Sequence, residues 1–308
     1  MTALADPDTA LAAFAGERAR LRALAYRLLG SVAEAEDTLQ DAWLRWSAVA
    51  PGSVGSAPAY LTTLVTRLAL DRLRSARVAR ERYYGLWLPE PEVAGWDSEP
   101  EDGMEPESVP LAMLLLLERL APDQRAVFVL REAMDLDYAE IAAMLGKSVE
   151  ACRQIMRRAR ARLAEPAAWG EPANAADAGR RLADAFAEAS VRRDYAAIVA
   201  LLSDDAQWLS DGGGMVRTAV NPLFGADRIA RFLIGVRRKR GVSFGFIPVR
   251  VNGGPGLLAE LGGAFRSVLA FDIAPCGDTG NRILRVYQIS NPEKLERVAV
   301  FYSSVRLI

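Results

Sequence analysis

The stretch from Glu150 to Arg162 carries the side chains whose types and spacing best define a chemistry. Five arginines lie between Arg153 and Arg162 with no acidic residue among them, and such a density repels itself unless a polyanion neutralises it. The side chains at the start of the stretch can hydrogen-bond base edges, whereas the later arginines suit phosphates. A helical hairpin with a solvated basic face is the plainer alternative. The predicted DNA contacts are Glu150, Arg153, Gln154, Arg157, Arg158 and Arg160.

Two short helices must position these side chains. Apolar residues at helical spacing predict a first helix that starts near Asp137, and Gly146 is placed to end it. Ser148 can cap a second helix. Within it Cys152, Met156, Ala159 and Leu163 should face the core and leave the arginines outside. This pattern predicts a helix-turn-helix whose later helix can enter a major groove.

Two earlier helices carry further polar faces. A helix predicted from Ala59 to about Tyr84 has an apolar side and a basic one, and it favours a second DNA-contacting surface over a merely solvated face. A helix from Glu34 to Trp46 should pack Leu39, Ala42, Trp43 and Trp46 inward and expose an acidic-polar face, which spacing alone does not distinguish from ordinary surface. The candidate residues are Arg67, Asp71, Arg72, Arg74, Arg77 and Arg80 on the basic helix, and Asp37, Gln40 and Asp41 on the acidic one.

Composition excludes several classes of function. The 308 residues suffice for two or three domains. Because the chain has no histidine, it can hold neither a Ser-His or Cys-His nucleophile nor a histidine-containing zinc site. Two cysteines fit a reducing cytoplasm. The apolar run Leu111 to Leu117 is too short to span a bilayer, and the N-terminal stretch lacks the basic region of a signal peptide. We therefore expect a cytoplasmic protein without a metal, a cofactor or a membrane partner.

The second half of the chain follows a different pattern. A connector from Gly85 to Pro110 is rich in proline and acid and should be extended. Its Trp87, Leu88 and Pro89 gain nothing from exposure, so we expect them to dock on another part of the chain. Beyond residue 178, helices precede and interrupt a series of strands, which fits an α+β domain with a curved sheet. The expected strands are Ala206–Ser210, Met215–Ala219, Val242–Val251, Leu257–Leu261, Phe265–Ile273, Ile283–Ile289 and Leu295–Tyr302.

Three motifs together resemble the extracytoplasmic-function sigma factors of bacterial RNA polymerase. They are EAEDTLQDAWLRW from Glu34, the arginine-rich helix RLALDRLRSARVARERY and the helix-turn-helix DYAEIAAMLGKSVEACRQIMRRARARL. The resemblance implies that domain two docks on core RNA polymerase through Asp37, Gln40 and Asp41. It also implies that the helix from Ala59 reads the −10 element of promoter DNA and that the helix after Ser148 reads the −35 element.

The segment WLPEP resembles the signature of a sigma subgroup with a SnoaL-like C-terminal extension. The resemblance implies a multidomain fold: two all-α sigma domains, the second a helix-turn-helix, and a C-terminal α+β cone. The expected divisions are residues 1–84, 85–110, 111–165, 166–177 and 178–308. Two further stretches resemble motifs of this subgroup, although each is also typical of an ordinary turn. They are Asp211, Gly212, Gly213 and Gly214, and the NPEKL sequence that begins with Asn291 and Pro292.

These features lead us to expect a sigma factor, not an enzyme, whose fused domain regulates it through an intramolecular contact with the sigma domains. Asp211, Asp272 and Tyr287 could face a pocket of the cone, where either a small-molecule ligand or an acid–base reaction is conceivable, although no pair of carboxylates has the spacing of a general acid and base. Two alternatives stay open: a ligand-sensing DNA-binding regulator independent of the polymerase, and a SnoaL-type cyclase or isomerase with a helical locator domain.

Overall fold

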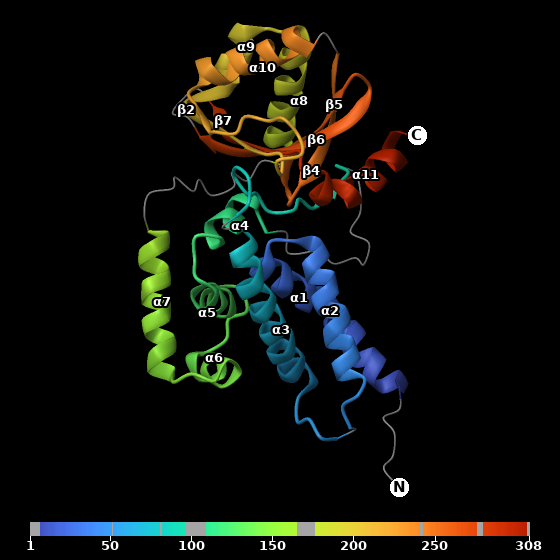
Figure 1. Ribbon diagram of the computed structural model, residues 1–308, viewed down its shortest axis with the longest axis vertical. Helices are drawn as coiled ribbons and strands as arrows, with labels where there is room; N and C mark the ends of the chain where they lie inside the picture. Colours follow the sequence, from blue (N-terminus) through green and yellow to red (C-terminus); the bar gives the residue numbers. More distant parts are fainter. Residues whose placement is uncertain are drawn as a thin grey trace. The chain divides into compact units, whose positions relative to one another are not determined.

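A computed structural model describes residues 7–50, 52–80, 82–96, 109–164, 176–240, 243–275 and 280–306 (Figure 1). The chain divides into two compact units. One comprises Met1–Arg82, Met104–Val109 and Met113–Ala167, and the other comprises Tyr83–Gly103, Pro110–Ala112 and Ala168–Ile308. Within the described ranges, every helix is too short or too polar to cross a membrane.

The first unit is built from helices that share one hydrophobic core. Leucines 21, 24 and 28 of the first helix are fully buried, and so are Val127 and Leu130 of a later one. Ser31 caps the second helix by accepting a hydrogen bond from the Glu34 amide. The helices of this unit are α1 (Pro7–Leu29), α2 (Val32–Trp46), α3 (Ala57–Arg80), α4 (Leu111–Leu117), α5 (Pro122–Glu132), α6 (Tyr138–Leu145) and α7 (Val149–Leu163).

The helices α6 and α7 form the predicted helix-turn-helix. Asp137 caps α6 within a capping box completed by Glu140. Gly146 ends α6 in the left-handed conformation at a φ of 63°, where a side chain would be strained. The Ser148 hydroxyl then accepts from the Ala151 amide and starts α7. Both predicted helices are therefore confirmed, with the caps that the sequence indicated.

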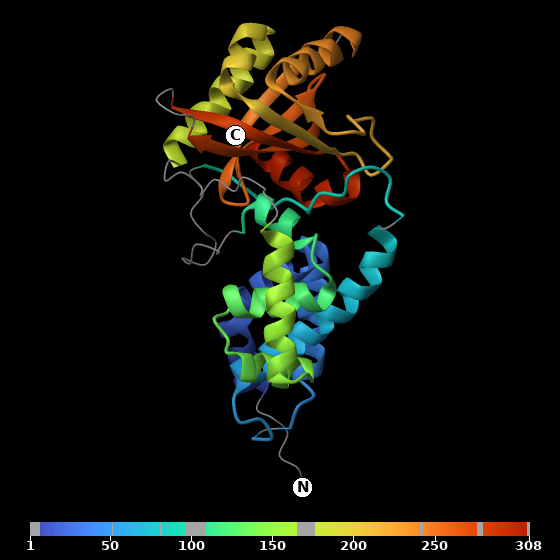
Figure 2. The ribbon, with the colours of Figure 1, turned by 90° about the vertical axis from the view of Figure 1, so that its left-hand side faces the viewer.

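The second unit is a curved sheet with helices α8, α9 and α10 on one face and α11 on the other (Figures 1 and 2). The strand order is β1-β4-β5-β6-β7-β2-β3, and only β2 and β7 are parallel. The elements are α8 (Ala176–Arg192), α9 (Tyr195–Leu201), α10 (Ala226–Arg240), α11 (Pro292–Arg306), β1 (Val93–Ala94), β2 (Leu202–Asp211), β3 (Leu223–Phe224), β4 (Phe244–Val251), β5 (Gly254–Leu261), β6 (Ala264–Pro275) and β7 (Asn281–Ile289).

The two faces of this sheet have different roles. On the face covered by α8, α9 and α10, Phe186 packs edge-on against Phe271 with ring centroids 5.3 Å apart, and Trp208 and Val286 belong to the same core. Register irregularities between β5 and β6 and between β6 and β7 bend the strands. Because side chains alternate along a strand, Tyr287 faces the opposite side of the sheet from Val286. The predicted fold class, helical domains followed by an α+β domain, is confirmed.

The structure corrects two of the expected strands. Leu295–Tyr302 is part of α11, because Leu295, Val298 and Tyr302 are buried at helical spacing rather than alternating. The Asn291 side chain accepts from the Glu293 amide at 3.0 Å, and Pro292 occupies the first turn, so NPEKL begins a helix and is not a turn between strands. Met215–Ala219 lies in a loop, and the short strand β3 follows it.

Candidate nucleic-acid interface and linker-binding site

Helix α7 presents its polar side chains to solvent and buries the opposite face. Cys152, Met156 and Ala159 are at most 1% exposed, and burial raises the pKa of the Cys152 thiol, as expected of a core residue. Among the ion pairs of the described residues, Arg160 is the one candidate −35 residue that pairs with a carboxylate on another helix. The candidates Glu150, Arg153, Gln154, Arg157, Arg158 and Arg160 are all exposed.

Two of these candidates have partners nearby. The Arg153 guanidinium lies 3.7 Å from Glu150 and 5.9 Å from the centre of the Tyr138 ring. Arg160 donates to Glu132 of α5 at 2.6 Å. Because both contacts are at the surface, they cost little to exchange for a base or a phosphate.

The basic side of α3 is not a free surface. Arg67 donates to the Met144 carbonyl at the end of α6, at 3.0 Å. Arg74 donates to Asp123 at the start of α5, also at 3.0 Å. Asp71 is exposed and pairs with Arg74 in the same helix. The side chain of Arg77 lies outside the described residues. The sequence predicted the arginines of α3, but it could not show that α5 and α6 supply acceptors for them.

A buried cluster of charges joins α3 to α4 and α5. Glu118 accepts hydrogen bonds from Arg80 and from Arg125, which is 1% exposed. Arg125 also donates to the Arg27 carbonyl of α1 at 3.0 Å. Burial lowers the pKa of the Arg125 guanidinium, and the neighbouring Glu118 carboxylate opposes that shift. Arg80 is therefore held by a carboxylate inside this unit.

Asp123 forms a second contact between α3 and the helix-turn-helix, since it pairs with Arg74 and Lys147. Burial alone would raise the pKa of its carboxyl group, but hydrogen bonds from Lys147 and Arg74 outweigh that effect, and the pKa is lowered. The carboxylate therefore stays ionised and holds one cation from α3 and one from the turn of the helix-turn-helix. In this arrangement the arginines of α3 contact groups that a phosphate would have to replace.

The acidic face of α2 is partly open. Asp37 and Gln40 are exposed. Asp41 accepts from Arg72 of α3 at 2.7 Å, and the same guanidinium lies 3.8 Å from Asp37. Three candidate residues of α2 thus lie on one face, and two of them, Asp37 and Asp41, pair with Arg72 of α3.

In the second unit, Asp211 at the end of β2 binds the linker segment from Tyr83 to Ala94. Its carboxylate is fully buried. It accepts from the Tyr83 hydroxyl at 2.6 Å and from the Leu88 amide at 2.9 Å. Burial and the adjacent Asp211 raise the pKa of the Tyr83 phenol far above its usual value, so the phenol stays a donor. Leu88 is itself fully buried.

The cation of this site is Lys294 from the first turn of α11. Its ammonium group donates to Asp211 at 2.7 Å and to the Leu88 carbonyl at 2.5 Å. It also lies 4.1 Å from the centre of the Trp87 ring and 5.0 Å from that of Tyr83, which is cation–π geometry. The side chain is 12% exposed. Lys294 therefore contacts the start of the linker through one carbonyl and two aromatic rings.

The glycines after Asp211 allow a close approach that other residues would block. Gly213 has a φ of 62°, and a Cβ there would lie 2.6 Å from the Asn291 side chain. The amide of Asn291 in turn donates to the Tyr83 hydroxyl at 2.8 Å. Further along the linker, Val93 and Ala94 form β1 and pair with β4. The three segments WLPEP, DGGG and NPEKL thus meet at the carboxyl ends of the parallel strands β2 and β7.

The sequence reasoning omitted two members of this site. Tyr83 was assigned to the end of a helix, and Lys294 was left out of the candidate residues. Their signal was a tyrosine just before the apolar WL pair and a lysine within the NPEKL motif. Trp87, Leu88 and Asp211 lie in the contact as described above, and Pro89 is buried beside them.

The residues considered for acid–base chemistry lie away from the cavity of the C-terminal domain. Asp272 accepts from Tyr287 at 2.6 Å and lies 3.4 Å from Arg285. Burial raises the pKa of both the Asp272 carboxyl and the Tyr287 phenol. Neither residue lines the cavity described below, and Asp211 does not either. Strand alternation directs these three side chains to the face of the sheet opposite that cavity.

A helix-turn-helix with an exposed basic helix, packed with a second arginine-bearing helix, defines a DNA-binding protein of the sigma type. Residues 14–78 match the model of Sigma-70 region 2, and residues 111–163 match that of Sigma-70 region 4. The chain is 42% identical over 235 residues to "ECF RNA polymerase sigma factor SigJ" of Mycobacterium tuberculosis, which covers 74% of this chain and 73% of that protein.

Two further matches extend over nearly the whole chain. "Probable ECF RNA polymerase sigma factor SigI" of the same species is 30% identical over 305 residues, or 95% of this chain and 97% of that one. The crystal structure of the SigJ protein matches with a TM-score of 0.72 and 31% identity, over 93% of this chain and 98% of that chain.

The chain belongs to the extracytoplasmic-function sigma factors of RNA polymerase. It acts in transcription initiation and is not an enzyme. The two alternatives, a polymerase-independent regulator and a cyclase or isomerase, are not favoured by these relatives.

Proposed function

We propose that this sigma factor brings core RNA polymerase to promoters in the cytoplasm and that its C-terminal domain regulates it in cis through the linker. In this proposal α7 reads the −35 element, α3 reads the −10 element, and the α2 face with Asp37, Gln40 and Asp41 binds the polymerase. The open side chains of α7 and α2 support these assignments.

Promoter binding by α3 requires an exchange of partners. Arg67, Arg74 and Arg80 are held by α6, α5 and Glu118. Arg67 and Arg74 are exposed and can exchange these acceptors for phosphates at little cost. Arg80, whose partner Glu118 is largely buried, can do so only if α3 moves away from the helix-turn-helix domain. The arrangement of the first unit is therefore a resting form, and the segment that joins α3 to α4 controls how easily it opens.

The observation that carries the regulatory proposal is the buried Asp211, which binds that joining segment to the C-terminal sheet. Tyr83 follows α3 by only a few residues, so the end of the DNA-binding helix and the docked linker are coupled through the chain. A fused domain acts at high effective concentration, and these contacts suffice without a separate partner protein.

Reconstituted transcription tests this proposal. Full-length chains carrying Asp211→Asn or Trp87→Ala are added to core RNA polymerase on a promoter that the parent chain uses, and the transcript yield is measured. We expect the yield of both variants to differ several-fold from that of the parent. Asp204→Asn, an exposed carboxylate on the same strand, is the matched control and should match the parent. Parental yields from both linker variants would refute regulation through the linker.

A further inference from the structure

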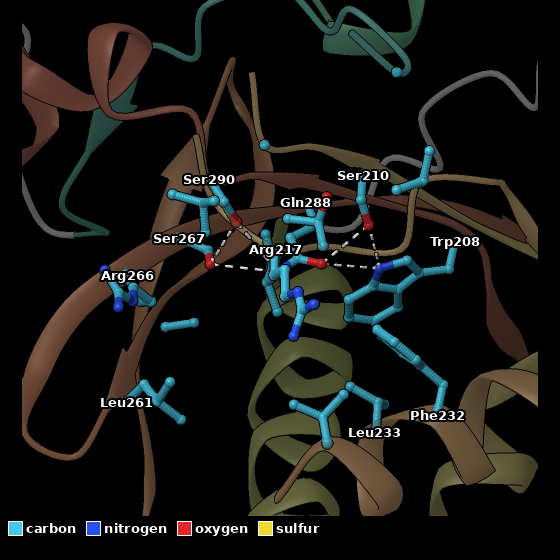
Figure 3. A pocket seen from close by; sticks show the side chains of 18 of the residues that line it. Trp208, Ser210, Arg217, Phe232, Leu233, Leu261, Arg266, Ser267, Gln288 and Ser290 are labelled. Carbon is cyan, nitrogen blue, oxygen red and sulfur yellow. Dashed lines mark hydrogen bonds between the residues drawn. The ribbon is translucent and has the colours of Figure 1, made fainter. Parts of the chain in front are cut away.

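The C-terminal domain contains a cavity of about 920 Å³ that the docked linker helps to enclose. Its wall is formed by the inner face of the sheet, by α10 and by the loop after Asp211 (Figure 3). The volume is at the upper end of the range of about 300–1,000 Å³ typical of small-molecule sites. Most of the lining is apolar, with aromatic rings from Trp208, Phe232, Phe244 and Phe246.

The phenylalanine rings are more exposed than the indole, since Trp208 is 2% exposed. Trp208 and Phe232 pack edge-on with centroids 5.9 Å apart. Phe232, Phe244 and Phe246 are only half-buried, although each lines the cavity. Half-buried aromatic side chains on a concave wall gain most from covering an apolar, ring-containing molecule.

A row of uncharged polar side chains lines the cavity wall from Trp208 at one end to Ser267 at the other (Figure 3). The Gln288 carboxamide oxygen accepts from the Trp208 indole at 3.1 Å and from the Ser210 hydroxyl at 3.0 Å. The Gln288 amide donates to Ser290 at 3.2 Å, and the hydroxyls of Ser290 and Ser267 are 2.9 Å apart. These groups satisfy one another, so this part of the wall is polar but uncharged.

The positively charged groups of the cavity lining are two arginines. Arg217 and Arg266 are both exposed. Across the described part of the chain, neither of them forms an ion pair or a hydrogen bond with a protein side chain. The cavity's one lining carboxylate in those same residues, Glu260, accepts from the Tyr302 hydroxyl at 2.7 Å. Two unpaired guanidinium groups beside an apolar wall match a carboxylate attached to an apolar body.

We propose that this cavity binds an organic carboxylate with an aromatic body and that the bound ligand stabilises the docked linker. In this proposal the ligand is held and not converted: Asp272 and Tyr287 lie away from the cavity, and the lining carboxylate Glu260 accepts a hydrogen bond from Tyr302. This inference rests on the proposed regulation through the linker, and it identifies a small-molecule ligand as the signal that controls linker docking.

The coupling follows from residues shared by the two sites. Tyr84 and Gly85 of the linker line the cavity. A Cβ on Gly214 would lie 3.3 Å from Tyr84, so this ring packs on the loop that closes the cavity. Asp211, which holds Leu88, lies between the lining residues Ser210 and Gly212. A molecule in the cavity therefore contacts the segment whose docking Asp211 maintains.

The test uses the full-length chain and two probes, 2-naphthoate and its neutral analogue 2-naphthalenemethanol, with binding measured by calorimetry. We expect naphthoate to bind at least tenfold more tightly than the alcohol. Arg217→Gln combined with Arg266→Gln should bring the two affinities together. Arg231→Gln, an exposed arginine of α10 that pairs with Asp227, should leave the preference intact. Ala259→Phe fills the cavity and should abolish binding of both probes, with circular dichroism confirming the fold.

Hydrogen exchange of the linker measures the coupling. Saturating naphthoate should slow exchange in the peptide that contains Leu88 at least threefold in the parent and leave it unchanged in the double arginine variant. Absent or equal binding of the two probes, consumption of naphthoate, or binding that leaves the Leu88 peptide unaffected would each overturn the proposal. If naphthoate binds as expected while Asp211→Asn leaves transcription unchanged, the ligand site stands and the regulatory function fails, so the two failures are distinguishable.

Discussion

Replacing Asp211 by asparagine is the sharpest perturbation of the docked linker. The buried carboxylate accepts hydrogen bonds from Tyr83, Leu88, Lys294 and the Gly213 amide. Asparagine keeps the size of the side chain but removes its charge and one acceptor oxygen, so the Lys294 ammonium loses its counter-ion. Removing one partner of a buried ion pair costs about 3–5 kcal/mol.

Hydrogen exchange at the Leu88 amide reports this loss directly, since that amide donates to Asp211. If the lower figure of about 3 kcal/mol falls on the docked linker alone, its opening constant rises roughly 100-fold, because each 1.4 kcal/mol is about a factor of ten. Mass spectrometry of the linker peptide should show exchange faster by about that factor. Asp204→Asn, on the same strand with a fully exposed carboxylate, should exchange like the parent.

Two results would refute this reasoning. Unchanged exchange at Leu88 would mean that Asp211 does not hold the linker. Equal acceleration in the central strands β6 and β7 would mean that the substitution unfolds the domain instead of releasing the linker.

Three further outcomes are expected. Arg153→Ala should alter base preference in the −35 element, whereas Arg160→Ala should weaken binding to all sequences and reduce the slope of log affinity against log salt by about one, as filter binding over a salt series measures. Glu118→Gln should lower the stability of the first unit by about 3–5 kcal/mol in denaturant unfolding, since it leaves the buried Arg125 without its carboxylate; an unchanged midpoint would contradict this. Tyr83→Phe should weaken linker docking by about 1.5–3 kcal/mol. Because the docked pKa of Tyr83 is raised above the undocked value of about 10, its contribution is complete below pH 10 and is lost as the pH rises above it, so the tryptophan fluorescence of the parent should titrate there and that of the variant should not.

The helix-turn-helix could be predicted closely because its signals are local. Asp137, Gly146 and Ser148 each determine a helix end through their own side chain or backbone conformation. The apolar spacing of α7 predicted which face is buried, and the opposite face is exposed as expected. Such features depend on neighbours within one or two helical turns.

The features that sequence reasoning missed depend on distant parts of the chain. Lys294 and Tyr83 are more than 200 residues apart, and nothing in either segment shows that both meet Asp211. The arginines of α3 could be predicted, but their acceptors on α5 and α6 depend on tertiary packing. The error at α11 has another cause: a short apolar segment fits both periods, and the capping role of Asn291 was the deciding signal.

The docked linker also limits how far the two DNA-binding domains can separate. With Tyr83 to Ala94 bound to the sheet, the connection that remains before α4 is the 16 residues 95–110, which span at most about 55 Å at full extension. Release of the docked segment frees a further 12 residues of chain, which reach about 40 Å at full extension. The gain in reach is the excess of that length over the span from the end of β2 to β4 that these residues cover when docked. Under the proposed function, docking therefore restricts the promoter spacing that α3 and α7 can bridge together. Inserting a glycine-serine stretch after Ala94 should make transcription less sensitive to Asp211→Asn, because the inserted residues restore the length of free chain that docking removes from the linker. Equal sensitivity in the extended chain would show that docking acts through the orientation of α3 and not through reach.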